Sequence, residues 1–174
     1  SMMQIDLGGQ VAVVTGGGRG IGKATALALA DAGAQVFVWD VDEGAGTAVA
    51  KEIQGRFQQV DVTSRAEVDA AVAELIEAAG QLDILVNNAG IVRDAQFVKT
   101  KDGEVLKQMT EQDFDSVFDV NVKGVFHCTQ AAVPHMVAQS HGRILNASSI
   151  VGLYGNFGQT NYVAAKMGVI GMTK

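Results

Sequence analysis

The stretch VAVVTGGGRGIG, residues 11–22, decides the fold that this sequence predicts. Its first five residues are an apolar, β-branched run typical of a buried strand in a parallel sheet. Glycines then predict a tight turn, and apolar residues recur at helical spacing from Gly20 to Ala32. Because the first N–H groups of such a helix are unpaired and lie at the positive end of its dipole, they can bind a pyrophosphate.

The glycines of this turn are the first evidence for a bound dinucleotide. A side chain at Gly16, Gly20 or Gly22 would hold the cofactor or the helix away from the turn. The alternative is a turn whose glycines serve its geometry alone, and the strand before it and the helix after it favour the dinucleotide. The cofactor contacts expected in this stretch are Gly16, Gly18, Arg19, Gly20, Ile21 and Gly22.

Strand and helix patterns alternate five times along the chain. Strand patterns cover residues 11–15, 34–40, 57–62, 82–88 and 142–150, and helical patterns follow them. This order predicts βαβ units and therefore an α/β fold of Rossmann type, a doubly wound parallel sheet between two layers of helices. No linker or internal repeat divides the chain, so we expect a single dinucleotide-binding domain over residues 4–174.

Local signals refine this outline. Ser64 and Glu67 form the pattern of a capping box, in which Ser64 caps a helix and Glu67 reaches back to Ser64. Gly80 is expected to end that helix. Residues 97–109 interrupt the alternation. Because Asp102-Gly103 separates two short, partly apolar arms, these residues predict a surface hairpin near the rim of the site.

Composition narrows the range of partners. The chain of 174 residues is 48% hydrophobic and has a net charge of −6, with no cluster of Lys and Arg. This balance disfavours nucleic acid or a membrane as a partner, and no apolar run is long enough to span a bilayer. The single cysteine, Cys128, and the lack of a signal peptide predict a cytoplasmic protein. His127, His135 and His141 lack the spacing of metal ligands, so no metal site is expected.

Asp40, at the end of the second strand pattern, bears on the choice of cofactor. A carboxylate about twenty residues beyond the glycine turn can accept hydrogen bonds from the adenosine ribose and repels a 2′-phosphate. Arg19 favours the opposite choice, because a cation in the turn could face that phosphate. We give the carboxylate more weight and expect NAD, with NADP as the alternative. The other interpretation of Asp40 is a solvated strand end.

Five motifs follow one another along the chain: Thr15-Gly16-x-x-x-Gly20-x-Gly22, Asn87-Asn88-Ala89-Gly90, Asn121, Ser149 and Tyr162-x-x-x-Lys166. Taken together and in this order, they resemble the motifs of the short-chain dehydrogenase/reductase family, and the resemblance runs from about Gln10 to Lys174. It implies NAD(P)-dependent interconversion of a secondary alcohol and a ketone. Around GNFGQTNYVAAK, residues 155–166, it is closest to reductases of 3-oxoacyl thioesters and to 3-hydroxyacyl dehydrogenases.

The resemblance also places two groups of residues around the cofactor. It implies that Asp61 and Val62 flank the adenine, and that Asn88, Ala89 and Gly90 line the cleft beyond the fourth strand. The physical expectation agrees, because open parallel sheets bind ligands at the carboxyl ends of their strands.

The last motif suits the chemistry of an alcohol and a carbonyl. When a carbonyl carbon receives a hydride, its oxygen needs a proton, and a tyrosine with a pKa of about 10 is a poor base for the reverse reaction. A lysine one helical turn away favours the phenolate. We therefore expect Tyr162 as general acid/base and Lys166 as its electrostatic partner, which by resemblance also holds the nicotinamide ribose. Taken alone, the two residues could be an ordinary surface pair.

Ser149 and Asn121 complete the expected catalytic set. Ser149 would hydrogen-bond the substrate oxygen; Ser148 competes with it by chemistry alone, and the family spacing selects Ser149. Asn121 lies on an otherwise apolar helical stripe, where a buried amide needs partners. A structural hydrogen bond is the usual explanation, whereas the resemblance implies a water-linked proton relay from the lysine. Cys128 on the same stripe is interpreted as a small buried residue.

The chain stops inside a helical pattern at Lys174. Members of the family continue with further strands, a final helix and a lobe that closes over the substrate, so we expect the C-terminal part of the domain to be missing. A cofactor-binding or interaction module without turnover is therefore the alternative function. The resemblance also implies a small alcohol or carbonyl compound as substrate, and a homo-oligomer formed through the helices that begin near Thr110 and Tyr162.

Overall fold

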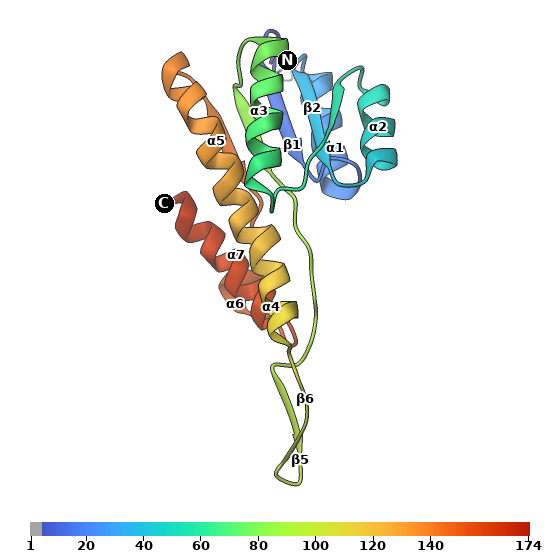
Figure 1. Cartoon of the computed structure of the whole chain (residues 1–174), viewed down its shortest axis with the longest axis vertical. Helices are drawn as coiled ribbons and strands as arrows, with labels where there is room; N and C mark the ends of the chain where they lie inside the picture. The colour runs from blue at the N-terminus through green and yellow to red at the C-terminus, as the bar shows by residue number, and fades with distance from the viewer. Residues whose placement is uncertain (1–4) are drawn as a thin grey trace.

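A computed structural model describes residues 5–174 of the chain. Parallel strands form one sheet in the order β3-β2-β1-β4-β7, with helices on both of its faces (Figure 1). The expected Rossmann-type α/β architecture is confirmed, whereas residue 4, where the domain was expected to begin, lies outside the described residues. The strands are β1 (Val11–Thr15), β2 (Gln35–Asp40), β3 (Arg56–Gln59), β4 (Ile84–Asn87) and β7 (Arg143–Asn146).

Three strands, β3, β4 and β7, end earlier than their sequence patterns because pairing stops at the carboxyl edge of the sheet. β3 pairs with β2 only as far as Asp40 opposite Gln59, and β7 pairs with β4 as far as Asn87 opposite Asn146. β4 also begins later than its pattern, at Ile84. The apolar residues that extend the patterns beyond these points belong to the loops that carry the site.

The helices fall into two groups along the chain. Those in the N-terminal half are α1 (Gly20–Asp31), α2 (Glu43–Glu52) and α3 (Arg65–Ala79). Those in the C-terminal half are α4 (Glu111–Phe118), the π-helical turn η1 (Asp119–Lys123), α5 (Gly124–Gln139), α6 (Val151–Tyr154) and α7 (Thr160–Thr173). No helix within residues 5–174 combines the length and the apolar character that crossing a membrane would require.

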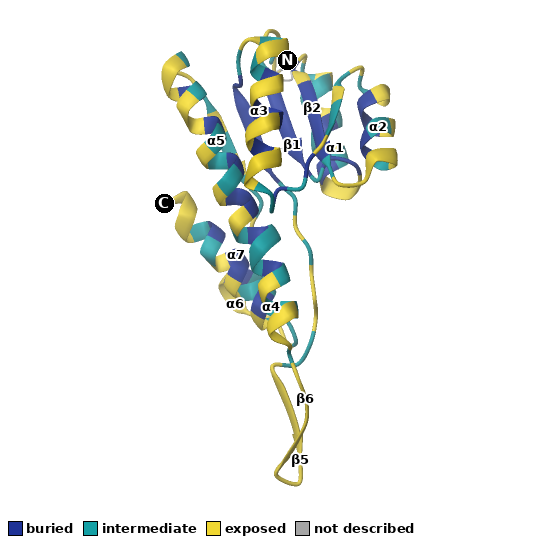
Figure 2. Ribbon diagram, in the orientation of Figure 1, coloured by how far each residue is buried: buried dark blue, intermediate teal, exposed yellow. Residues whose placement is uncertain are grey.

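The core consists of two apolar clusters, one on each face of the sheet. Val11 and Val13 of β1 pack with α3 and α5, whereas Ala12 and Val14 pack with α1 and α2. Alternate residues of a strand point to opposite faces, so a strand covered on both faces is apolar throughout. All of β1 is accordingly buried (Figure 2), as the run VAVVT predicts.

The start of α3 follows its predicted capping box only in part. Ser64 caps the helix, because its Oγ accepts the N–H of Glu67 at 3.3 Å. Glu67 does not reach back to Ser64, whose N–H donates instead to the carbonyl of Asp61. The Glu67 carboxylate accepts the N–H of Asp61 at 2.8 Å, so it fastens the loop before the helix. The predicted end at Gly80 is confirmed, with φ of +79°.

The predicted hairpin is present and extends away from the sheet (Figures 1 and 2). Strands β5 (Val98–Lys101) and β6 (Glu104–Gln108) are antiparallel, and every residue in both is exposed. Asp102 and Gly103 both have positive φ, as a two-residue hairpin turn of this handedness requires. The segment just before the hairpin is joined to the start of α7, since the Ala95 N–H donates to the carbonyl of Gly158.

Candidate active site

Two adjoining cavities lie at the carboxyl edge of the sheet. The larger, of about 730 Å³, has the glycine loop, the ends of β2 and β4 and the loop after β3 in its wall. The smaller, of about 410 Å³, has Tyr162 and Lys166 in its wall. The two cavities share five lining residues, and so form one continuous cleft: Ile21, Asn88, Gly90, Ile91 and Arg93.

Most of the predicted cofactor residues line this cleft. The glycines Gly18 and Gly20 are not in either wall, although both belong to the loop that shapes it. Those in the larger cavity are Gly16, Arg19, Ile21, Gly22, Asp40, Asp61, Val62, Asn88, Ala89 and Gly90, and Tyr162 and Lys166 line the smaller one.

Two glycines leave room that any side chain would fill. Gly16 has φ of +62°, and a Cβ on it would lie 2.9 Å from the Cα of Ala89. A Cβ on Gly22 would lie 2.0 Å from the carbonyl oxygen of Gly16. The start of α1 can therefore approach the loop only without side chains at these positions. The strand end joins this arrangement through Thr15, whose Oγ1 accepts the N–H groups of Asn88 and Ala89.

Asp40 is more than a solvated strand end. Its carboxylate accepts the N–H of Gly18 and the N–H of Asp42, each at 2.9 Å, so it organises the glycine loop from the end of β2. Arg19 forms an ion pair with Asp42. A backbone hydrogen bond from Ala45, followed by the charge of Arg19, holds the pKa of Asp42 below its ordinary value. The cation that favours a 2′-phosphate is thus already paired with a carboxylate.

Tyr162 and Lys166 are not a surface pair. Lys166 is only 6% exposed, and its Nζ donates a hydrogen bond of 2.8 Å to the carbonyl of Ala147. The same Nζ lies 5.6 Å from the centroid of the Tyr162 ring. Burial lowers the pKa of Lys166 from its ordinary value, because removal from water disfavours the charged form.

The two serines after β7 are placed differently. Ser148 lines the smaller cavity with Tyr162 and Lys166, and its Oγ donates to the carbonyl of Lys166 at 2.8 Å. Ser149 is not in the cavity wall, and its Oγ accepts the N–H of Val151 at the start of α6. The structure thus brings Ser148 to the tyrosine cavity and uses Ser149 at a helix end.

Asn121 has the partners that a buried amide needs. It is 1% exposed and lies in the π-helical turn η1. Its Oδ1 accepts the N–H of Ile91 at 2.8 Å, and its Nδ2 donates to the carbonyl of Ile91 at 3.0 Å. These hydrogen bonds are the structural role that was the alternative explanation for Asn121. They fix the loop after β4, which forms the shared wall of both cavities.

Two residues near Tyr162 did not stand out in the sequence. Arg93 lines both cavities, and Asn161 is fully buried beside Tyr162. The signal for Asn161 was no more than an amide at the start of a helical pattern. Its importance depends on contacts with residues far away in the sequence, which no local pattern reveals.

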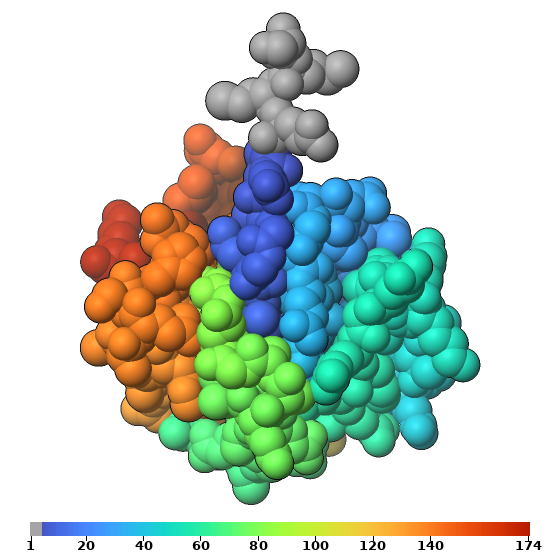
Figure 3. All heavy atoms as spheres, turned by 90° about the horizontal axis from the view of Figure 1, so that it is seen from above, coloured from blue at the N-terminus to red at the C-terminus, as the bar shows by residue number. Residues whose placement is uncertain are grey.

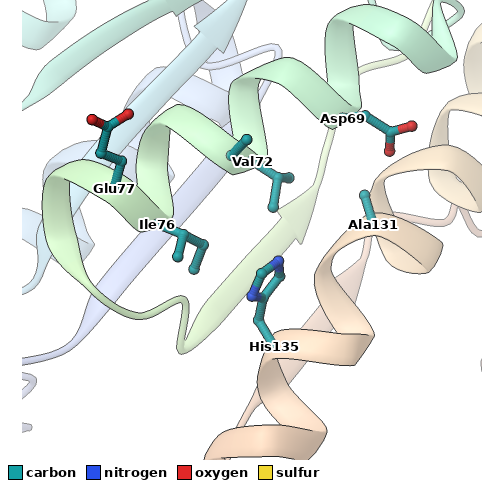
Figure 4. A pocket seen from close by; sticks show the side chains of 7 residues that line it. Asp69, Val72, Ile76, Glu77, Ala131 and His135 are labelled. Atoms are coloured by element: carbon teal, nitrogen blue, oxygen red, sulfur yellow. The ribbon is translucent and has the colours of Figure 1, made fainter.

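A third cavity lies away from the strand ends, between α3 and α5, which pack side by side (Figures 3 and 4). It measures about 430 Å³, and His135 points from α5 toward Val72 and Ile76 on α3 (Figure 4). Within residues 5–174, no three His, Cys, Asp or Glu side chains are grouped as metal ligands. Cys128 is fully buried, and burial raises the pKa of its thiol to about 12, so it stays protonated and unreactive.

Comparisons with known proteins show which family the chain resembles. The profile of the family described as short chain dehydrogenase matches residues 10–174. The 3-oxoacyl-[acyl-carrier-protein] reductase FabG of Thermotoga maritima is 46% identical over 173 residues, which cover 97% of this chain and 67% of the reductase. The reductase of the same name from Staphylococcus aureus is 46% identical over 169 residues, covering 94% of this chain and 65% of the reductase.

A relative of another kind is also similar. The peroxisomal multifunctional enzyme type 2 of Drosophila melanogaster is 45% identical over 175 residues, which cover 94% of this chain and 28% of that enzyme. The chain thus spans about two thirds of the length of the reductases and a smaller part of the multifunctional enzyme.

Proposed function

The chain belongs to the short-chain dehydrogenase family, and we propose that it is an NAD(P)-dependent oxidoreductase that interconverts a secondary alcohol and a ketone. The observation that carries this proposal is the position of Tyr162 and Lys166 in a cavity that adjoins the glycine-loop cavity. A dinucleotide could extend along the shared wall and bring its nicotinamide next to the tyrosine. When bound, the nicotinamide supplies or accepts the hydride.

The residues of the cleft fit such a cofactor. The space beside Gly16 and Gly22 admits no side chain, and the start of α1 offers main-chain N–H groups to a pyrophosphate. We assign the adenosine to the part of the larger cavity between Asp40 and the pair Asp61 and Val62. Tyr162 and Lys166 would hold the nicotinamide ribose at the other end.

We further propose a preference for NAD over NADP. The carboxylate of Asp40 stands in the cavity wall where it would accept hydrogen bonds from the ribose hydroxyls and repel a 2′-phosphate. The pairing of Arg19 with Asp42 supports this choice, because it offsets the cation that could receive that phosphate.

In reduction, Tyr162 would give its phenolic proton to the substrate oxygen, and in oxidation it would take that proton back. The buried cation of Lys166 favours the phenolate that remains. Ser149 is the proposed hydrogen-bond donor to the substrate oxygen. Asn121 is the proposed support of a water-linked proton relay that leads from Lys166.

For the substrate we propose 3-oxoacyl thioesters or their 3-hydroxyacyl counterparts, from the resemblance around residues 155–166 and the names of the similar reductases. We also propose a cytoplasmic homo-oligomer that associates through the run from α4 to α5 and through α7. Apolar side chains exposed on these helices support the interface: Phe126, Val133, Val137, Met167 and Met172.

The test compares reduction of a 3-oxobutanoyl thioester by NADH and by NADPH in the wild type and in Tyr162→Phe. We expect Tyr162→Phe to lower kcat by about 10²- to 10⁴-fold, as loss of a general acid does. Tyr154→Phe is the matched control, because Tyr154 is exposed and lines neither cavity of the cleft. Equal rates in the wild type and Tyr162→Phe would overturn the assignment. NADH binding without turnover of any ketone or thioester would favour a cofactor-binding module instead.

A further inference from the structure

The side chain of Asn161 is fully buried, with 0% of its surface exposed, in the first turn of α7. An amide removed from water must be hydrogen-bonded or it destabilises the fold. All of its partners are main-chain groups. Its Oδ1 accepts the N–H of Tyr162 at 2.8 Å, and its Nδ2 donates to the carbonyls of Arg93 at 2.9 Å and Asp113 at 3.2 Å. One side chain thus joins α7, α4 and the loop after β4.

The bond to Tyr162 replaces a missing helix cap. The first N–H groups of a helix have no partner within the helix, and side chains normally supply one. Gln159, the N-cap residue of α7, makes no capping hydrogen bond with its side chain. The Tyr162 N–H is instead satisfied by the neighbouring amide of Asn161. The main chain that carries the phenol is therefore held by Asn161.

Tyr162 and Lys166 are held by different parts of the molecule. Lys166 is fixed from the loop after β7, through the carbonyl of Ala147 and the hydroxyl of Ser148. Tyr162 is fixed from the loop after β4, through Asn161 and the carbonyl of Arg93. The Lys166 Nζ lies 5.6 Å from the centroid of the tyrosine ring, one helical turn away on α7, so the two attachments hold the two members of one pair.

Two further connections accompany the buried one. The Ala95 N–H donates to the Gly158 carbonyl at 2.9 Å, and the half-buried side chain of Gln159 donates to Asp94 at 3.0 Å. The loop of Arg93 and the start of α7 thus form one seam, and Asn161 is its buried member. Because Arg93 lines both cavities, the hydrogen bonds of this seam hold in place the part of the wall where the two cavities meet.

We infer that Asn161 is a positioning residue, which holds the Tyr162 phenol against the loop that joins the two cavities and so sets the geometry of proton transfer. The inference rests on the proposed function, since it assigns Tyr162 to catalysis. Asn161 itself is not expected to touch the substrate or the cofactor, because it lines neither cavity.

The kinetic test uses Asn161→Ala, Asn161→Ser and the control Gln159→Ala, which removes the side-chain hydrogen bonds to Asp94 and Asn156 and leaves those of Asn161 intact. A misplacement on the scale of 1 Å costs about 100-fold in rate, so we expect kcat per NADH-binding site to fall by about 10- to 100-fold in Asn161→Ala. Asn161→Ser should fall between that variant and the wild type, and Gln159→Ala should stay near the wild type. The affinity for NADH should fall much less than kcat, and the isotope effect with NADH deuterated at C4 should change.

A structural role alone predicts a different pattern, in which the variant melts earlier while the molecules that still bind NADH keep the wild-type kcat. That result would overturn the inference, as would an equal loss of NADH affinity and kcat. If neither variant folds, amide hydrogen exchange in the wild type tests the inference instead. The Tyr162 amide should exchange several-fold more slowly than the Thr160 and Asn161 amides before it, and equal rates would contradict the inference. Exchange needs no turnover, so inactivity of the wild type would count against the proposed function alone.

Discussion

At the glycine-loop end of the cleft the critical surfaces are main chain, whereas at the Tyr162 end they are side chains held by buried amides. The glycine loop of the first end is built from residues close together in sequence, with Gly16 and Gly22 packed against one another. The second joins the loop after β4, α4 and α7 through Asn161, and joins that loop to η1 through Asn121. The first end should therefore be damaged by added volume, and the second by the loss of single hydrogen bonds.

The largest effect is expected at the Tyr162 end, where Ser149→Ala and Ser148→Ala can be compared. If Ser149 binds the developing oxyanion, its loss should lower kcat by about 10²- to 10³-fold, with NADH affinity unchanged. Ser148→Ala should cost less, because its Oγ serves the Lys166 carbonyl. Steady-state kinetics with a 3-oxobutanoyl thioester decide between them. A larger loss in Ser148→Ala would transfer the role to the serine that lines the cavity.

At the glycine-loop end, Gly22→Ala should weaken cofactor binding. Its Cβ would lie 2.0 Å from the Gly16 oxygen, and such overpacking costs about 1–3 kcal/mol. If that strain falls on the cofactor-bound form, NADH affinity drops by about 5- to 100-fold. Fluorescence titration with NADH measures this change in affinity. Gly171→Ala in α7 is the matched control, since no atom lies within 4 Å of its Cβ. Unchanged affinity in Gly22→Ala would contradict the proposed role of the loop.

A smaller effect is expected from Asp40→Asn, which keeps an acceptor for the Gly18 N–H but removes the charge. Hydrogen bonds to charged groups contribute about 1.5–3 kcal/mol, so NADH affinity should fall by about tenfold or more. NADPH affinity should rise, because the repulsion of its 2′-phosphate is removed. Parallel titrations with the two cofactors give the ratio. A wild type that already prefers NADPH would refute the choice of NAD.

The smallest effect is the pH dependence that Lys166 gives to stability. Its pKa is lowered by burial from 10.5, so between the lowered value and 10.5 the unfolded chain binds more protons than the folded one. The free energy of unfolding should therefore rise with pH across this window. Lys166→Met should lose that rise, as measured by urea unfolding from neutral pH up to pH 10.5. An identical slope in both proteins would show that Lys166 ionises alike in the folded and unfolded states.

The contrast between the glycine-loop end and the Tyr162 end also explains which features could be predicted from the sequence. The β1–turn–α1 unit follows local rules of strand, glycine and helix spacing, and it forms as predicted. The hairpin at Asp102-Gly103 does so too. By contrast, Glu67 takes the Asp61 N–H instead of completing its capping box, because the Ser64 N–H already donates to the Asp61 carbonyl.

The Tyr162 end could be predicted only as a set of residue types. Family spacing selected Ser149, yet in the structure Ser148 lines the cavity with Tyr162. The π-helical turn at Asn121 and the three bonds of Asn161 also left no pattern in the sequence. Each depends on segments that meet only after the sheet has formed.

The strand order has a further consequence, for the time course of folding. β1 lies between β2 and β4, and the Val11 N–H bonds the Asp83 carboxylate across 72 residues of chain. Closing so long a loop is slow, whereas the β5–β6 hairpin joins near neighbours and can form within microseconds. The two halves of the cleft meet only once β4 has paired with β1. Cofactor affinity should thus emerge late in refolding, and the cofactor then stabilises the state that has completed this step.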